Sequence, residues 1–183
     1  MSNFNQTDAP QSGESVAVIS TNHGQMKLRL FPEIVGSAAE NFIELAKQGK
    51  YNGAPFHRVI KNFMIQGGDF INGNGTGGHA AEGEDSKIGD VYDPRLRHIK
   101  GALSWAKTSA PNSIGSQFFI VHAEDGAHFL DHPEDGHSHQ GYTVFGQLYE
   151  GFGVLDEIAC VKTDKRDRPK DDVIIESVVI ETL

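Results

Sequence analysis

Apolar and polar residues alternate along several short stretches of the chain, which is the pattern of half-buried β-strands. In residues 25–31, for example, Met26, Leu28 and Leu30 fall on one face and polar side chains on the other. Further stretches of this kind lie at residues 16–22, 56–60, 64–68, 99–107, 117–121, 142–149 and 173–182. About eight short strands, mostly joined by short loops, predict a mainly β fold.

Two other stretches follow the helical period. Residues 36–48 place Phe42 and Leu45 on one apolar face before a glycine stop at Gly49, and residues 153–159 form a shorter helix of the same kind. A short turn of helix is expected at residues 125–130. Many short antiparallel strands leave edges exposed unless the sheet closes. We therefore predict a closed eight-stranded antiparallel β-barrel capped by two α-helices, with the functional site on its outer wall because small barrels are filled with side chains.

The candidate chemistry is concentrated in residues 56–70, FHRVIKNFMIQGGDF. A turn at residues 61–63 would pair Arg58 with Gln66 across a hairpin. Because directly paired residues share a face, Arg58, Met64 and Gln66 are expected to point the same way. One face then carries a cation, a thioether and an amide, as a binding site would, and the other face is apolar.

The composition excludes some classes of protein and makes some partners unfavourable. Lys+Arg is 16 and Asp+Glu is 25, and the resulting net charge of −9 disfavours nucleic acid and anionic membranes as partners. The apolar runs are too short to span a bilayer. The single Cys160 excludes an internal disulfide and fits a reducing compartment. Residues 1–14 are polar and lack the features of a signal peptide, so we expect a flexible tail on one domain of residues 15–183, and a cytoplasmic location.

The sequence carries partial signals of three other kinds of site. Gly73-x-Gly75-x-x-Gly78 matches the dinucleotide fingerprint, but no helical stripe follows it, so we interpret it as a surface loop. A serine hydrolase fits poorly because no Gly-x-Ser-x-Gly elbow occurs. Five of the nine histidines fall within residues 122–139, where His137 and His139 could bind a transition metal.

For these histidines we favour a solvated loop, and no metal or other cofactor is expected. His57 is expected to pack on the core face of its strand and to take no part in catalysis.

The segments FHRVI and FMIQGGDF, followed by GSQFF at residues 115–119, closely resemble the cyclophilin family of peptidyl-prolyl isomerases. The resemblance continues at Ser104–Ala106, Phe129–Leu130, Tyr142–Gly146 and Asp171–Ser177, and covers nearly all of residues 15–183. It implies the same barrel fold and the isomerisation of X–Pro bonds in proline-containing peptides and unfolded protein clients.

Isomerisation of an X–Pro bond crosses a barrier of about 18–20 kcal/mol without breaking a bond, so it needs neither a nucleophile nor a metal. In the twisted transition state the prolyl nitrogen regains a lone pair, to which a fixed guanidinium can donate a hydrogen bond. By the resemblance, Arg58 is this catalytic donor.

The resemblance also assigns residues to substrate binding: Phe63, Met64, Gln66, Ala106, Gln117, Phe119, Phe129, Leu130 and Tyr142. The proline ring would sit among Phe63, Met64, Phe119 and Leu130. Phe129 stands where cyclosporin-sensitive members tend to carry Trp, whose ring N–H donates a hydrogen bond that Phe cannot make, so we expect weak cyclosporin binding.

The alternative function on the same fold is a non-catalytic module that binds proline peptides, or a chaperone holdase. The intact Arg58 favours the enzyme, since a binder needs the ring pocket but not the transition-state donor. A monomer is expected.

Overall fold

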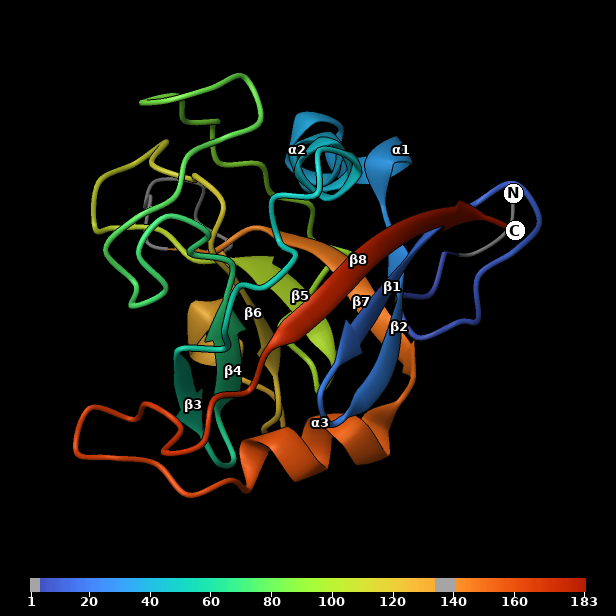
Figure 1. The fold of residues 1–183 in the computed structure, drawn as a ribbon. Coiled ribbons are helices and arrows are strands. Elements are labelled where there is room, and N and C mark those ends of the chain that lie inside the picture. Colours follow the sequence, from blue (N-terminus) through green and yellow to red (C-terminus); the bar gives the residue numbers. More distant parts are fainter. Residues whose placement is uncertain (1–3, 134–140) are drawn as a thin grey trace.

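In a computed structural model, which describes residues 4–133 and 141–183, eight antiparallel strands form one curled sheet (Figure 1). The strand order is β3-β4-β6-β5-β7-β2-β1-β8. The strands are β1 (Ser15–Thr21), β2 (Gly24–Leu30), β3 (Arg58–Ile60), β4 (Met64–Gly67), β5 (Ala102–Trp105), β6 (Phe118–Val121), β7 (Val144–Glu150) and β8 (Ile175–Thr182). The predicted mainly β class and antiparallel arrangement are confirmed.

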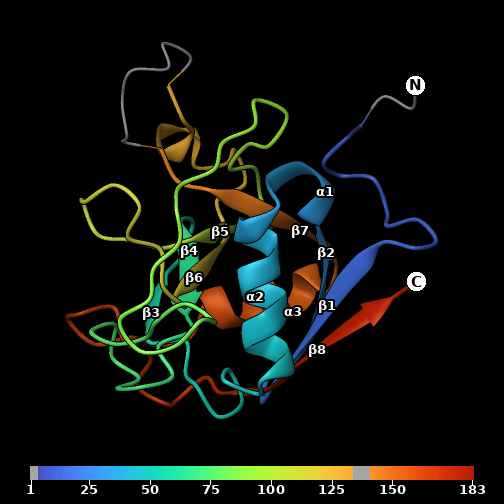
Figure 2. The ribbon, with the colours of Figure 1, turned by 90° about the horizontal axis from the view of Figure 1, so that it is seen from above.

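Helices cover both ends of the curled sheet (Figures 1 and 2). α1 (Pro32–Val35) and α2 (Ser37–Lys47) lie at one end, and α3 (Phe152–Ala159) lies at the other. The two predicted helices are confirmed to within a residue or so, whereas the short α1, which begins at a proline, was not predicted. Among the helices of the described residues, none has the length and apolar character needed to cross a membrane.

The ends of the sheet do not pair as a ladder. β3 and β8 are its edge strands, and the segment that precedes β3 meets the start of β8 through an isolated bridge between Pro55 and Ile174. Phe56 donates its N–H to the carbonyl of Val173 at 2.8 Å, and Ile175 donates to Ala54 at 2.9 Å. Between these bonds Pro55 has no N–H to extend the ladder. The predicted closed barrel is thus observed as an open, curled sheet.

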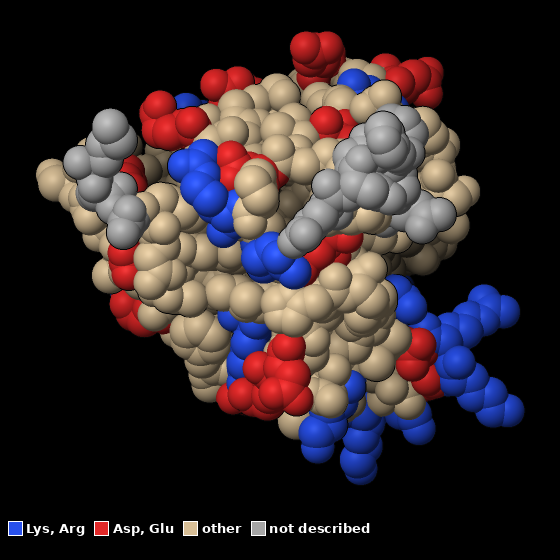
Figure 3. Space-filling model, turned by 180° about the vertical axis from the view of Figure 1, so that it is seen from behind, with Lys and Arg blue, Asp and Glu red and all other residues tan. Residues whose placement is uncertain are grey.

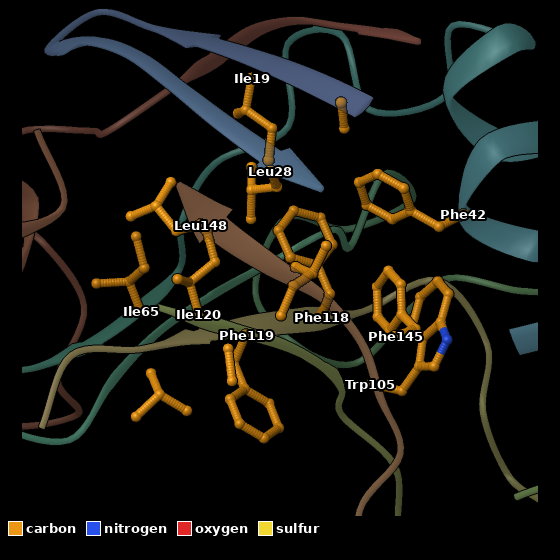
Figure 4. Close-up of a cluster of buried hydrophobic side chains, with 14 of the residues drawn as sticks. Ile19, Leu28, Phe42, Ile65, Trp105, Phe118, Phe119, Ile120, Phe145 and Leu148 are labelled. Atoms are coloured by element: carbon orange, nitrogen blue, oxygen red, sulfur yellow. The ribbon is translucent and has the colours of Figure 1, made fainter. Parts of the chain in front are cut away.

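Aromatic side chains fill the inside of the curl beneath α2 (Figure 4). The ring of Trp105 stacks on Phe145 with centroids 4.5 Å apart, and its Nε1–H donates to the Ala38 carbonyl at 2.9 Å. Phe42 packs edge-on against Phe118, with centroids 5.4 Å apart. Trp105 has no exposed surface.

The segment 4–14 makes specific contacts where a flexible tail was expected. Gln6 is buried and donates its Nε2–H to the Oε1 of Gln147 at 2.9 Å. The guanidinium of Arg29 is also buried, and Glu14 accepts hydrogen bonds from it at 2.6 and 2.7 Å. A buried charge requires a partner, and the segment supplies it.

Candidate functional site

The β3–β4 hairpin has the predicted register. Arg58 lies opposite Gln66, and Val59 lies opposite Ile65. Val59 and Ile65 are buried in the core, while Arg58 is exposed on the other face. Asn62 makes the turn at φ 59°, a left-handed conformation that Asn tolerates better than most residues. The face assignment made from the sequence is therefore confirmed for these residues of the hairpin.

A pocket of about 360 Å³ lies on the Arg58 face of this hairpin. It is lined by His57, Arg58, Phe63, Met64, Gln66, Asn74, Gly75, Ala106, Lys107, Phe119, Leu130, Tyr142 and Arg166. Eight of the ten site residues predicted from the sequence are in this set, and they come from segments far apart in the chain. Gln117 and Phe129 are the two that do not line it.

The floor of the pocket is apolar and rigidly supported. Met64 and Phe119 are almost completely buried, with 2% and 4% of their surface exposed. The Phe119 ring stacks on the His98 ring at 5.9 Å and meets Tyr142 edge-on at 6.0 Å. A pocket with buried apolar walls and a few polar groups at its mouth suits a small saturated ring attached to a peptide.

Gln117 supports Gln66 from an adjoining pocket of about 230 Å³, which shares Gln66, Gly75, Ala106 and Lys107 with the first. Gln66 donates its Nε2–H to the Oε1 of Gln117 at 3.1 Å. Gln117 in turn donates its Nε2–H to the carbonyls of Gly75 and Gly77, at 2.9 and 2.8 Å. These hydrogen bonds orient the side-chain amide of Gln66. The Oε1 of Gln66 can then accept a hydrogen bond from a peptide N–H.

Asp69 holds the loop that supports Gln117, and this residue was not predicted. It is 1% exposed, and its carboxylate accepts hydrogen bonds from five backbone N–H groups at 2.9–3.2 Å. The donors are Ile71 and Asn72 at Oδ1, and Asn74, Gly75 and Gly77 at Oδ2. Burial alone would raise the pKa of Asp69, but these N–H groups outweigh it and lower the pKa to about 2.

The guanidinium of Arg58 has no ion-pair partner among the described residues. Lys107, which also lines the pocket, pairs with Asp90 at 3.0 Å, and both side chains are only 4% exposed. Arg58 can therefore direct its planar set of N–H donors toward a bound peptide.

His57 differs from its expected placement. It is buried, but it lines the pocket together with the loop glycine Gly75. A Cβ built at Gly75 would lie 3.0 Å from the Nε2 of His57. Burial lowers the pKa of His57, Arg168 and Arg58 lower it further, and Asp69 opposes them. The imidazole is therefore neutral at neutral pH.

Phe129 lies on the rim of the pocket, on a 3₁₀ turn (His128–Leu130) at the position where a short helical turn was predicted. Its ring is 75% exposed and lies 5.6 Å from the Phe63 ring. An exposed aromatic ring beside an apolar pocket can cover part of a bound peptide.

A buried polar network anchors this rim to the sheet, and it too was not predicted. Asp131 accepts a hydrogen bond from Arg97 Nε at 2.6 Å and lies 2.8 Å from the Nδ1 of His98. The other ring nitrogen of His98 lies 2.9 Å from the Oγ of Ser104. Burial alone would raise the pKa of Asp131, but its hydrogen bonds, above all those with His98, hold it far below the usual range.

In the described part of the chain, no group of three or more His, Cys, Asp or Glu side chains is arranged to hold a metal ion. The candidate ligands His137 and His139 lie outside the described residues.

The known proteins that this chain resembles belong to one family. The family described as cyclophilin type peptidyl-prolyl cis-trans isomerase/CLD matches residues 16–180. A Staphylococcus haemolyticus protein described as a peptidyl-prolyl cis-trans isomerase is 38% identical over 200 residues, covering 99% of each chain. A Streptococcus pyogenes protein described as a bifunctional phosphatase/peptidyl-prolyl cis-trans isomerase is 41% identical over 196 residues. That match covers 97% of this chain, which spans only 41% of the streptococcal protein.

Solved structures that resemble this one belong to the same family. A cyclophilin type peptidyl-prolyl cis-trans isomerase from Cryptosporidium parvum superposes with a TM-score of 0.83 at 34% identity, covering 93% of this chain and 99% of that one. The same protein crystallised in the presence of the dipeptide Ala-Pro gives a TM-score of 0.81 at 35% identity, covering 92% and 99%.

Proposed function

The chain belongs to the cyclophilin-type peptidyl-prolyl cis-trans isomerase family and is a peptidyl-prolyl isomerase, and from this premise we propose that Arg58 is its catalytic residue. The observation that carries the proposal is the exposed Arg58 guanidinium, which has no ion-pair partner in the described chain and lies at a pocket with an apolar floor. A cation placed there without a counter-charge is available to the substrate.

In the mechanism we propose, the proline ring enters among Phe63, Met64, Phe119 and Leu130. As the preceding amide twists, the prolyl nitrogen becomes pyramidal, and an Arg58 N–H donates a hydrogen bond to its lone pair. This bond exists only in the twisted state, so it lowers the barrier without tightening ground-state binding. Lowering the barrier by about 6 kcal/mol would accelerate the exchange roughly 10⁴-fold.

The remaining site residues hold the peptide. The Gln66 carbonyl accepts a hydrogen bond from the substrate backbone, and Gln117 keeps Gln66 in place. Ala106 and Tyr142 shape the groove, and Phe129 covers its rim. The Cryptosporidium neighbour crystallised in the presence of Ala-Pro supports proline-containing peptides as the ligand class.

We further propose that residues 15–183 act as a monomeric isomerase domain in the cytoplasm, on unfolded protein clients. The net charge of −9 supports this, because like-charged copies repel one another. Light scattering after size exclusion tests the monomer.

We also propose that the backbone bonds on either side of Pro55 close the curled sheet into a barrel.

The test of the mechanism is Arg58→Ala, measured by NMR exchange on a short X–Pro peptide, which gives the isomerisation rate and the affinity together. We expect kcat/KM to fall by two or more orders of magnitude, a loss of about 3 kcal/mol or more, while affinity falls much less. Arg58→Lys should also be poor, because the ammonium lacks the planar fork.

Lys61→Ala is the matched control, because Lys61 is an exposed cation at the turn of the same hairpin but does not line the pocket. Its kcat/KM should be close to that of the wild type. If the rate and affinity of Arg58→Ala fall in parallel, Arg58 is a binding residue and the mechanism fails. A non-catalytic binding module would show no acceleration even in the wild type.

A further inference from the structure

The charge at the pocket is opposite in sign to the charge of the chain. The chain carries a net −9, yet the described residues that line the pocket include three cations, Arg58, Lys107 and Arg166, and no Asp or Glu. Lys107 is paired with the buried Asp90. The guanidinium groups of Arg58 and Arg166 therefore dominate the field that a bound peptide experiences.

Arg166 comes from a loop, residues 162–170, that folds back on itself. Lys170 donates its N–H to the carbonyl of Lys162 at 2.8 Å, and Asp164 donates to Arg168 at 2.8 Å. At the tip, the Asp164 carboxylate accepts hydrogen bonds from the backbone N–H groups of Arg166, at 2.7 Å, and Arg168, at 3.1 Å. The backbone on both sides of Arg166 is thus fixed.

Two further bonds hold this tip against the pocket. Val59, the neighbour of Arg58 on β3, donates its N–H to the carbonyl of Asp167 at 2.8 Å. Arg168 donates its Nη1–H to the carbonyl of Gly73 at 2.6 Å, which ties the tip to the loop that carries Gly75. Arg166 is therefore brought to the pocket mouth by its neighbours in the chain, while its own side chain is exposed.

The loop carries five cations, Lys162, Lys165, Arg166, Arg168 and Lys170, against the two carboxylates of Asp164 and Asp167. Of these cations, Arg168 pairs with Asp172, just after the loop, at 3.3 Å. Figure 3 shows Lys and Arg side chains gathered at the lower right, where this loop lies when the view of Figure 1 is turned round. The Asp164 carboxylate already accepts two N–H groups of the loop itself. The pocket mouth is consequently a basic edge on an acidic protein.

We propose that this isomerase favours proline segments that carry a carboxylate side chain next to the proline, and that Arg166 is the residue that recognises it. The proposal rests on the function proposed for the Arg58 pocket. A guanidinium can bind a carboxylate through two parallel hydrogen bonds. Because Arg166 is exposed, the preference should be modest, roughly two- to fivefold per carboxylate, and it should weaken as salt screens the charges.

The experiment compares peptides that differ only by Glu or Gln at the positions flanking one proline, with kcat/KM measured by NMR exchange at low and high salt. In the wild type, the best Glu peptide should exceed its Gln partner roughly two- to fivefold at low salt, and the ratio should approach one at high salt. Arg166→Gln should bring the ratio close to one, and Arg166→Glu should favour a Lys peptide instead.

Lys165→Gln is the matched control, because it removes the same charge from the adjacent position, which does not line the pocket. It should keep most of the Glu preference. A wild-type ratio near one, a ratio that survives Arg166→Gln, or an equal loss in Lys165→Gln would overturn the proposal. A wild type that does not accelerate the Gln peptides would instead refute the function proposed for the pocket.

Discussion

Replacing Asp69 by Asn should destabilise the protein and disturb the site without changing the size of the side chain. The amide oxygen of Asn can still accept the N–H groups of Ile71 and Asn72. Its NH₂ group would face the N–H groups of Asn74, Gly75 and Gly77, where only an acceptor fits.

The expected loss of stability can be worked out in two ways from the hydrogen bonds of Asp69. The pKa of Asp69 is lowered from 3.8 to about 2, which corresponds to about 2 kcal/mol of preference for the ionised form in the folded state. Three N–H groups that lose their partner would cost on the order of 1 kcal/mol each. We therefore expect Asp69→Asn to lower the free energy of unfolding by about 2 to 3 kcal/mol at pH 7.

Urea denaturation as a function of pH tests this. Because the pKa is lower in the folded state, the wild type holds this stabilisation above pH 4 or so and loses it as the pH falls through about 2. The gap between wild type and variant should narrow over that range. Asp164→Asn is the control: the same change at an exposed carboxylate that accepts two N–H groups should cost less. A gap that stays constant down to pH 2 would refute the reasoning.

Three further predictions concern other parts of the molecule. Asp131→Asn should lower the free energy of unfolding by about 2 kcal/mol, since an amide cannot keep all the hydrogen bonds that the carboxylate makes with Arg97 and His98; a loss below 1 kcal/mol in chemical denaturation would contradict this. Trp105 should fluoresce at short wavelength and resist iodide quenching because it is fully buried, and a red-shifted, readily quenched spectrum would show that it is not buried. Phe129→Trp should tighten cyclosporin binding in a titration, because the exposed ring would gain an N–H donor, with stability unchanged; low-nanomolar binding by the wild type would refute the hydrogen-bond argument.

Features that depend on residues close in sequence could be predicted. The register of the β3–β4 hairpin follows from a turn at Asn62 and from alternation over a few residues on either side. Strand number and helix positions are also set by local patterns.

Features that depend on residues far apart in the sequence could not be predicted. Gln6 is one polar residue in a polar segment, and only the fold brings it to Gln147. Arg166 is one of several cations in a charged loop, and nothing in its neighbours indicates which of them reaches the pocket. Asp69 did leave a signal, since a carboxylate directly before a run rich in Gly and Asn is suited to accept several N–H groups from that loop.

The position of β1 between β2 and β8 has consequences for synthesis on the ribosome. β1 and β2 can pair early, but the other side of β1 pairs with β8, so that Ile19 meets Val178. Closing so long a stretch of chain costs entropy and slows folding. Until β8 has left the exit tunnel, the nascent chain presents a strand edge open to other chains. The edge of β1 is therefore exposed to aggregation until β8 emerges and covers it.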